Sequence, residues 1–137
     1  MRFNALIPEL AVVSCAESLA FYLDLLGFSV AYERPEEGFA FLEFGDAQLM
    51  LDQIGLGRTF DGDGPLTRPL GRGINLQIKV PAIGPLLARL ERADWPLYLP
   101  PEERWYRGGA RELGNRQFVV ADPDGYLLRF FEELGVR

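Results

Sequence analysis

The fold is decided by the stretch Arg116-Gln-Phe-Val-Val-Ala-Asp-Pro-Asp-Gly-Tyr-Leu-Leu-Arg-Phe-Phe131, which predicts two strands joined by a tight turn. Apolar runs supply the strands, and Pro123 and Gly125 supply the geometry of the turn. The second strand carries Arg129 in an otherwise apolar run. A charge in such a run is costly unless it faces a cavity, a partner or a ligand.

A second hairpin of the same kind lies earlier in the chain, over Phe41-Leu-Glu-Phe-Gly-Asp-Ala-Gln-Leu-Met-Leu-Asp52. Two such hairpins in one short chain indicate an internal duplication. Working outward from each hairpin gives the same order of elements, a strand, a helix and three strands. The first set is expected at residues 6–13, 14–26, 28–33, 39–44 and 47–53, and the second at 74–80, 81–92, 96–99, 116–121 and 126–132.

This order predicts one α+β domain made of two tandem βαβββ modules, over residues 1–53 and 73–137. The Gly- and Pro-rich stretch 54–72 between them is expected to be a linker. Residues 100–115, which hold Trp105 and Tyr106, are expected to form a long loop. A loop of this length in a compact domain is often functional.

Strand alternation gives each module an apolar face for its helix and a mixed face for something else. Over residues 74–80 the apolar face carries Ile and Leu, whereas the other face carries Asn75, Gln77 and Lys79. Mixed faces often only meet solvent. Several residues of these faces are nevertheless too apolar for a fully wetted surface, namely Ile7, Met50, Leu127 and Phe131. A ligand cleft or a subunit interface fits better.

Composition and net charge limit the classes of molecule that the chain is expected to bind and indicate where it is located. A formal charge of -6 opposes binding to nucleic acid or to anionic lipid, and it would favour a cationic ligand. The single cysteine allows no disulfide within the chain. No apolar run reaches the roughly 20 residues of a membrane span, and the N-terminus lacks the pattern of a signal peptide, so a cytoplasmic location is expected.

The chain contains no histidine. Histidine is the commonest metal ligand and the commonest general base near neutral pH. We therefore expect neither a bound metal nor a cofactor.

The chain resembles the vicinal oxygen chelate superfamily, which includes glyoxalase I, extradiol dioxygenases and bleomycin resistance proteins. The resemblance rests on two segments, Ser18-Leu-Ala-Phe-Tyr-Leu-Asp-Leu-Leu-Gly-Phe28 and Asp122-Pro-Asp-Gly-Tyr-Leu-Leu-Arg-Phe130, and it extends over both halves of the chain. It implies two βαβββ modules whose curled sheets together form a cleft, and it implies a homodimer. It is less specific for function, because this fold hosts several chemistries.

Metal enzymes of the superfamily place His, Gln or Glu ligands on the first and last strand of each module. The resemblance puts those positions at Ile7, Met50, Asn75 and Arg129, and none of these is a good ligand for a divalent metal. Arginine carries a permanent positive charge and would repel the ion. Glyoxalase or dioxygenase chemistry is therefore disfavoured.

This departure points to the branch of bleomycin resistance proteins, which sequester a cationic, aromatic glycopeptide without altering it and thereby give antibiotic resistance. Such binding needs aromatic surfaces and carboxylates. We expect the ligand to contact ten residues: Ile7, Glu9, Met50, Asp52, Asn75, Gln77, Trp105, Tyr106, Arg129 and Phe131.

Two alternatives stay open at this point. Glu9 or Asp52 could serve as the base of an enzyme that works without the usual ligand set, or the cleft could bind nothing tightly. Arg129 is expected either to pair with Glu9 or Asp52 or to be left for a ligand, because a buried charge needs a partner.

Overall fold

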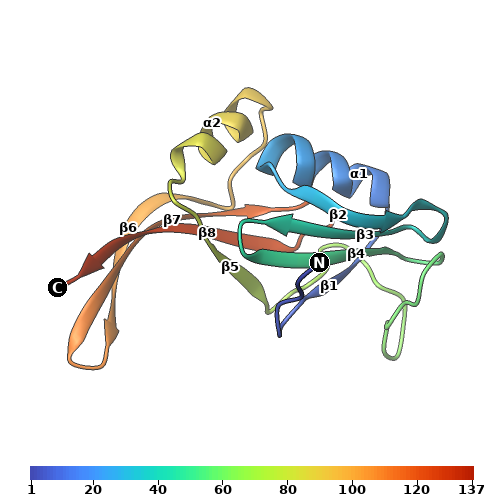
Figure 1. Cartoon of the computed structure of the whole chain (residues 1–137), viewed down its shortest axis with the longest axis horizontal. Helices are drawn as coiled ribbons and strands as arrows, with labels where there is room; N and C mark the ends of the chain where they lie inside the picture. Colours follow the sequence, from blue (N-terminus) through green and yellow to red (C-terminus); the bar gives the residue numbers. More distant parts are fainter. The chain divides into compact units, whose positions relative to one another are not determined.

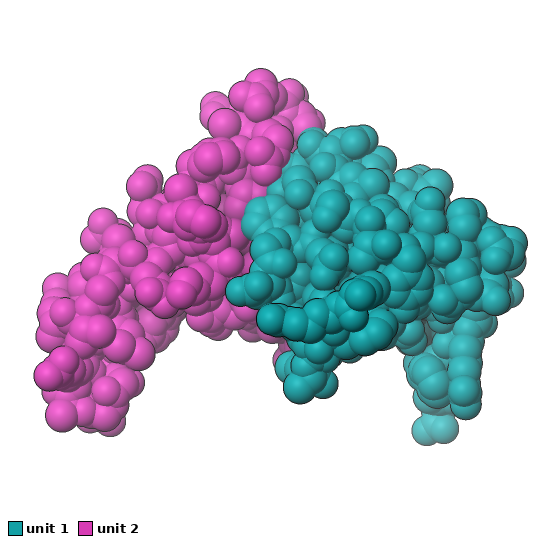
Figure 2. Space-filling view, viewed as in Figure 1, with its two compact units in different colours: residues 1–70 teal, residues 71–137 magenta.

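The computed structural model describes all 137 residues and divides them into two compact units. Unit 1 comprises residues 1–70 and unit 2 comprises residues 71–137 (Figure 2). In each unit, one sheet of four strands has its helix on one side (Figure 1). We call the other side of each sheet its helix-free face.

Unit 1 begins with strand β1 (Glu9–Val12), helix α1 (Cys15–Leu19) and the π-helical turn η1 (Ala20–Leu26). The strands β2 (Ser29–Arg34), β3 (Phe39–Phe44) and β4 (Ala47–Gln53) follow, with the short 3₁₀ helix η2 (Pro35–Glu37) between β2 and β3. The strand order is β1-β4-β3-β2. Strand β1 runs parallel to β4, and the other pairs are antiparallel.

Unit 2 consists of strand β5 (Asn75–Lys79), helix α2 (Gly84–Arg92) and the strands β6 (Leu99–Gly108), β7 (Arg111–Ala121) and β8 (Leu127–Val136). Its strand order is β5-β8-β7-β6, with β5 parallel to β8. Unit 2 thus repeats the topology of unit 1 strand for strand. The predicted α+β fold of two tandem βαβββ modules is confirmed.

The Asp122-Pro-Asp-Gly turn is held by its first residue. Asp122 Oδ1 accepts hydrogen bonds from the backbone N–H groups of Asp124 and Tyr126, both at 2.9 Å. Gly125 has φ of 97°, which a residue with a side chain rarely adopts. The turn therefore fixes the register of β7 with β8, in which Phe118 lies opposite Phe130 and Val119 lies opposite Arg129.

The core of each unit lies between its sheet and its helix. In unit 1 the ring of Tyr22 is fully buried and makes edge-to-face contacts with Phe21 and Phe28, at 5.2 and 5.3 Å between centroids. In unit 2 the core is formed by the stacked rings of Phe118 and Phe130 and by buried residues at and just before α2, namely Ile83, Leu86 and Leu90. Consecutive residues of a strand alternate between faces, so Arg129 and Phe131 lie on the helix-free face.

The start of unit 1 follows the expected capping chemistry. Ser14 is the N-cap of α1, and its hydroxyl accepts a hydrogen bond of 3.2 Å from the backbone of Glu17. Gly27 ends η1 in the left-handed conformation, with φ of 87°. Strand β1 is shorter than the expected 6–13, so Leu6 and Ile7 precede it.

The expected loop over 100–115 is wrong. These residues form most of β6 and the start of β7, joined by a turn at Gly109. Many of their side chains are charged, so the sequence has no apolar alternation that would indicate strands. The register nevertheless brings residues of opposite charge together. Glu103 lies opposite Arg116, and Arg107 lies opposite Glu112. Such cross-strand pairs stabilise an exposed hairpin.

The helices of the structure are too short and too polar for any of them to be a candidate membrane span.

Candidate functional site

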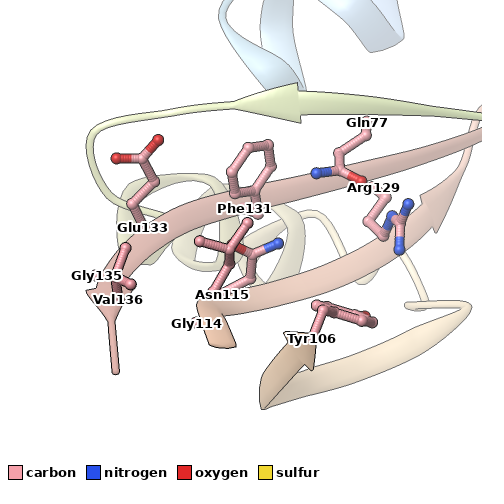
Figure 3. Close-up of a pocket in the computed structure, with 10 residues that line it drawn as sticks. Gln77, Tyr106, Gly114, Asn115, Arg129, Phe131, Glu133, Gly135 and Val136 are labelled. Atoms are coloured by element: carbon pink, nitrogen blue, oxygen red, sulfur yellow. The ribbon is translucent and has the colours of Figure 1, made fainter. Parts of the chain in front are cut away.

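A pocket of about 500 Å³ lies on the helix-free face of unit 2. Its size is in the usual range for small-molecule sites. Strands β5, β6, β7 and β8 all contribute to it, and Figure 3 shows how their side chains lie around it. Ten residues line this unit 2 pocket: Gln77, Tyr106, Leu113, Gly114, Asn115, Arg129, Phe131, Glu133, Gly135 and Val136.

Arg129 occupies the middle of the sheet beneath this pocket. It lies opposite Gln77 of β5 in the parallel pairing and opposite Val119 of β7 in the antiparallel pairing. Its Nε atom is buried and has no hydrogen-bond partner. The ion pairs of unit 2 join other residues, Lys79 with Glu133 and Arg137 with Glu112. The guanidinium of Arg129 takes part in neither of these ion pairs.

A hydrogen bond from Gln117 fixes the position of Tyr106. Gln117 is almost fully buried, and its Nε2 donates hydrogen bonds to Tyr106 Oη at 2.7 Å and to Glu102 Oε1 at 3.2 Å. Its own Oε1 is buried without a partner. These bonds fix the phenol ring at the edge of the unit 2 pocket, so one aromatic wall is in position before any ligand arrives.

A second pocket, of about 520 Å³, lies on the helix-free face of unit 1. Phe39 and Phe60 supply aromatic surface, and charged groups surround them. The charged residues that line this unit 1 pocket are Glu9, Arg34, Glu37, Asp52 and Arg58.

The basic residues of the unit 1 pocket already have contacts. Arg34 forms an ion pair with Glu37, and its guanidinium carbon lies 4.0 Å from the centroid of the Phe39 ring. The guanidinium of Arg58 lies 5.3 Å from the centroid of Phe60. Glu9 and Asp52 are left as two neighbouring carboxylates.

The environment of Glu9 raises the pKa of its carboxyl above the usual 4.5, first through burial and then through the negative charge of Asp52. Arg34 opposes this rise only in part. A positive charge placed beside Glu9 and Asp52 would relieve their repulsion. The unit 1 pocket thus suits a cation.

The residues at the positions where metal ligands would be required are not a set that binds a divalent metal ion. On the first and last strands, Glu9 lies opposite Met50 in unit 1, and Gln77 lies opposite Arg129 in unit 2. A thioether and a guanidinium are poor partners for a divalent ion of the kind that His and Glu bind. No group of three or more His, Cys, Asp or Glu side chains is arranged to hold a metal.

The structure distributes the ten predicted site residues over several places. Gln77, Tyr106, Arg129 and Phe131 line the unit 2 pocket, and Glu9 and Asp52 line the unit 1 pocket. Ile7 and Met50 are half-buried in unit 1 and line neither of these pockets, and Asn75 is exposed at the start of β5, opposite Leu127.

Trp105 lies on the side of β6 away from Tyr106. Its ring covers Gly114, since a Cβ atom on that glycine would lie 2.6 Å from the ring. The guanidinium of Arg137 lies over the same ring, at 4.2 Å from the ring centroid. Trp105 therefore does not line the unit 2 pocket.

Sequence reasoning missed Asn115, Gln117, Phe39 and Phe60. Asn115 and Gln117 lie on β7, on the face that also carries Tyr106 and Arg129, and recognising β6 as a strand would have revealed them. Phe39 and Phe60 lie outside the motif segments, and Phe60 belongs to the stretch expected to be a linker. No pattern in the sequence singles out that ring.

A family model described as Glyoxalase/Bleomycin resistance protein/Dioxygenase superfamily matches residues 4–130. No curated protein matches the sequence.

Solved structures share the fold. TioX from Micromonospora sp. ML1 is similar with a TM-score of 0.71 and 20% identity, covering 96% of this chain and 100% of that chain. A virulence protein from Salmonella typhimurium is similar with a TM-score of 0.69 and 21% identity, over 96% and 98% of the two chains. A glyoxalase/bleomycin resistance protein/dioxygenase from Alicyclobacillus acidocaldarius has a TM-score of 0.64 and 20% identity, over 98% and 96%.

Proposed function

Because the chain belongs to the Glyoxalase/Bleomycin resistance protein/Dioxygenase superfamily, we propose that it binds a small organic molecule without a metal ion and releases it unchanged. One observation carries the proposal. Two neighbouring carboxylates, Glu9 and Asp52, line a pocket with the rings of Phe39 and Phe60. This combination recognises a flat ring that bears a positive charge.

Charge pairing and ring contacts act together on such a ligand. A cation beside Glu9 and Asp52 gains attraction from both carboxylates, and Asp52 is 7% exposed, so screening by water is reduced there. The rings of Phe39 and Phe60 attract cations, and the guanidinium groups of Arg34 and Arg58, which lie against them, would have to make way for a flat cationic ring. A bleomycin-type drug has both features, and sequestering it would give antibiotic resistance.

Isothermal titration calorimetry tests this proposal with metal-free bleomycin and with benzamidine, a small flat cation. We expect both to bind and to bind less tightly as the salt concentration rises, because salt screens the charge term. Asp52→Asn should weaken binding, whereas Asp24→Asn, which removes the same charge from an exposed position of η1, should leave it unchanged. Equal binding by both variants would contradict the proposal.

A second candidate function is catalysis with Glu9 as a general base. The observation in its favour is the raised pKa of Glu9, because a base whose pKa is shifted toward neutrality by burial and a like charge is typical of active sites. The two candidates differ in the fate of the ligand. Chromatography of the ligand after long incubation with the protein separates them, since only catalysis changes its structure and hence its retention time.

A further inference from the structure

We propose that the unit 2 pocket is a second binding site, which takes a carboxylate attached to a flat apolar ring, with Arg129 as the residue that binds the carboxylate. This inference goes beyond the proposed function, because the site lies in the other unit and uses neither Glu9 nor Asp52. The two pockets then have opposite preferences for ligand charge.

The first argument is the charge of Arg129. Arginine stays protonated at every physiological pH and offers donors in a planar fork. Here the fork lies on a sheet face with a buried Nε atom that has no hydrogen-bond partner. Buried donors in folded proteins are nearly always satisfied, and an exception calls for an explanation such as a functional role.

The second argument is that the nearest carboxylate of the pocket is already engaged. Glu133 lines the same pocket, but its Oε1 lies 3.1 Å from the ammonium of Lys79. Both side chains of that pair are more than half exposed, at 60% and 63%. Glu133 therefore points to Lys79 at the edge, and Figure 3 shows its carboxylate apart from the Arg129 guanidinium.

The third argument is the apolar wall that adjoins Arg129. Phe131 stands two residues further along the same strand, and Tyr106 faces it from β6, where its hydroxyl is fixed by Gln117 (Figure 3). Leu113 and Val136 continue this wall. The backbone of Gly114 and Gly135 also lines the pocket.

The polar residues around Arg129 suit the oxygens of a carboxylate. Gln77 lies directly opposite Arg129 on β5, and Asn115 projects from β7 into the same pocket. Each side-chain amide offers an N–H₂ group to an oxygen that the guanidinium does not reach. A carboxylate bound by a guanidinium forms charge-assisted hydrogen bonds, which are stronger than neutral ones.

Naphthoate is a suitable probe, and naphthamide, which has the same ring system and no charge, is its control. Binding is followed by calorimetry and by ¹⁵N-NMR at saturating millimolar ligand. We expect naphthoate to bind at least about tenfold more tightly than naphthamide, the difference that one charge-assisted hydrogen bond supplies. The resonances of Gln77, Asn115 and Phe131 should shift, while those of Glu9 and Asp52 should not.

Two variants complete the test. Arg129→Gln should lose the preference for naphthoate over naphthamide, whereas Arg116→Gln should keep it. Arg116 is exposed and lies on the same strand as Gln117 but on its other face, so it provides the same change of charge outside the pocket. Circular dichroism of both variants verifies that they are folded.

The comparison of the two ligands on the unaltered protein needs no variant and decides the matter if Arg129→Gln does not fold. Equal affinity for naphthoate and naphthamide, or no binding of naphthoate at millimolar concentration, would overturn the inference. The benzamidine titration reports separately on the unit 1 pocket. A negative result with naphthoate therefore does not contradict the proposed function of the unit 1 pocket, and a negative result with benzamidine does not contradict the inference about the unit 2 pocket.

Discussion

Gln77 lies directly opposite Arg129 where β5 runs parallel to β8. Glu9 lies opposite Met50 at the corresponding place in unit 1, where β1 runs parallel to β4. The first and last strands of each module therefore meet at a pair of residues of which one, Met50 or Arg129, is a poor ligand for a divalent metal ion. This arrangement underlies the account of the protein as a metal-independent binder.

The first prediction concerns metal content. Protein purified without chelators should contain no stoichiometric zinc, nickel or iron, because Met50 and Arg129 stand where ligands would be needed. Inductively coupled plasma mass spectrometry measures this. One equivalent of any of these metals, removable by a chelator, would contradict the prediction.

The second prediction concerns the stability contributed by Arg129. Arg129→Met removes a buried donor that has no partner, and an unsatisfied buried donor costs about 1–3 kcal/mol. The free energy of unfolding in urea should therefore rise by about 1 kcal/mol or more. A loss of about 3–5 kcal/mol would instead show that a buried carboxylate partner had been left uncompensated.

The third prediction concerns Glu9 and pH. The pKa of Glu9 is raised on folding, so between its usual value of 4.5 and the raised value the folded state binds more protons than the unfolded state. Stability from this group is present below that window and is lost as the pH rises through it. Glu9→Gln should remove this slope and raise the stability at neutral pH by about 0.5 kcal/mol or less, because the side chain is largely exposed.

Thermal unfolding from mildly acidic to neutral pH measures the effect of Glu9→Gln. Glu36→Gln, which alters an exposed carboxylate of η2, is the control. A Glu9→Gln protein that is less stable than the unaltered one at neutral pH would mean that Glu9 has a stabilising partner.

The fourth prediction concerns the contact between Gly114 and Trp105. A Cβ atom on Gly114 would lie 2.6 Å from the indole ring, so Gly114→Ala must displace Trp105 or the strand. We expect a loss of about 1–3 kcal/mol, the usual cost of overpacking. Gly84→Ala is the matched control, because nothing lies within 4 Å of a Cβ atom there and its loss should be negligible.

The fifth prediction is a homodimer. Apolar side chains at the far ends of β7 and β8 are exposed, with Leu113 at 46% and Val136 at 53%. The two residues lie opposite each other in the register of β7 with β8, and a dimer would cover this exposed apolar pair. Light scattering at micromolar concentration should give twice the chain mass, and Leu113→Glu should lower it. A mass of one chain for the unaltered protein would count against a shared interface.

The two hairpins and the repeated order of elements were predictable from the sequence because their signals are local. Asp122-Pro-Asp-Gly fixes a turn, and apolar alternation on either side of it fixes two strands. Arg129 also stood out, since a charge amid apolar residues marks a special position. The sequence could not predict that the Nε atom of Arg129 has no hydrogen-bond partner, because this depends on which side chains the fold brings beside it.

The outer part of the hairpin formed by β6 and β7, residues 100–115, escaped prediction as strand for a different reason. Its residues are exposed on both faces over much of their length, so they carry no apolar alternation. The cross-strand charges that stabilise it become visible only once the register is known. Two residues were missed as a consequence: Asn115, which lines the unit 2 pocket, and Gln117, which binds the hydroxyl of Tyr106.

The central claim is that the protein binds an organic ligand without a metal and leaves it intact. Calorimetric titration of chelator-treated protein with metal-free bleomycin tests it most directly, followed by mass spectrometry of the recovered drug. The account predicts a saturable heat of binding that is unchanged by added zinc or nickel, and a drug of unaltered mass. No heat at high micromolar drug, binding only after a metal is added, or a changed mass would contradict it.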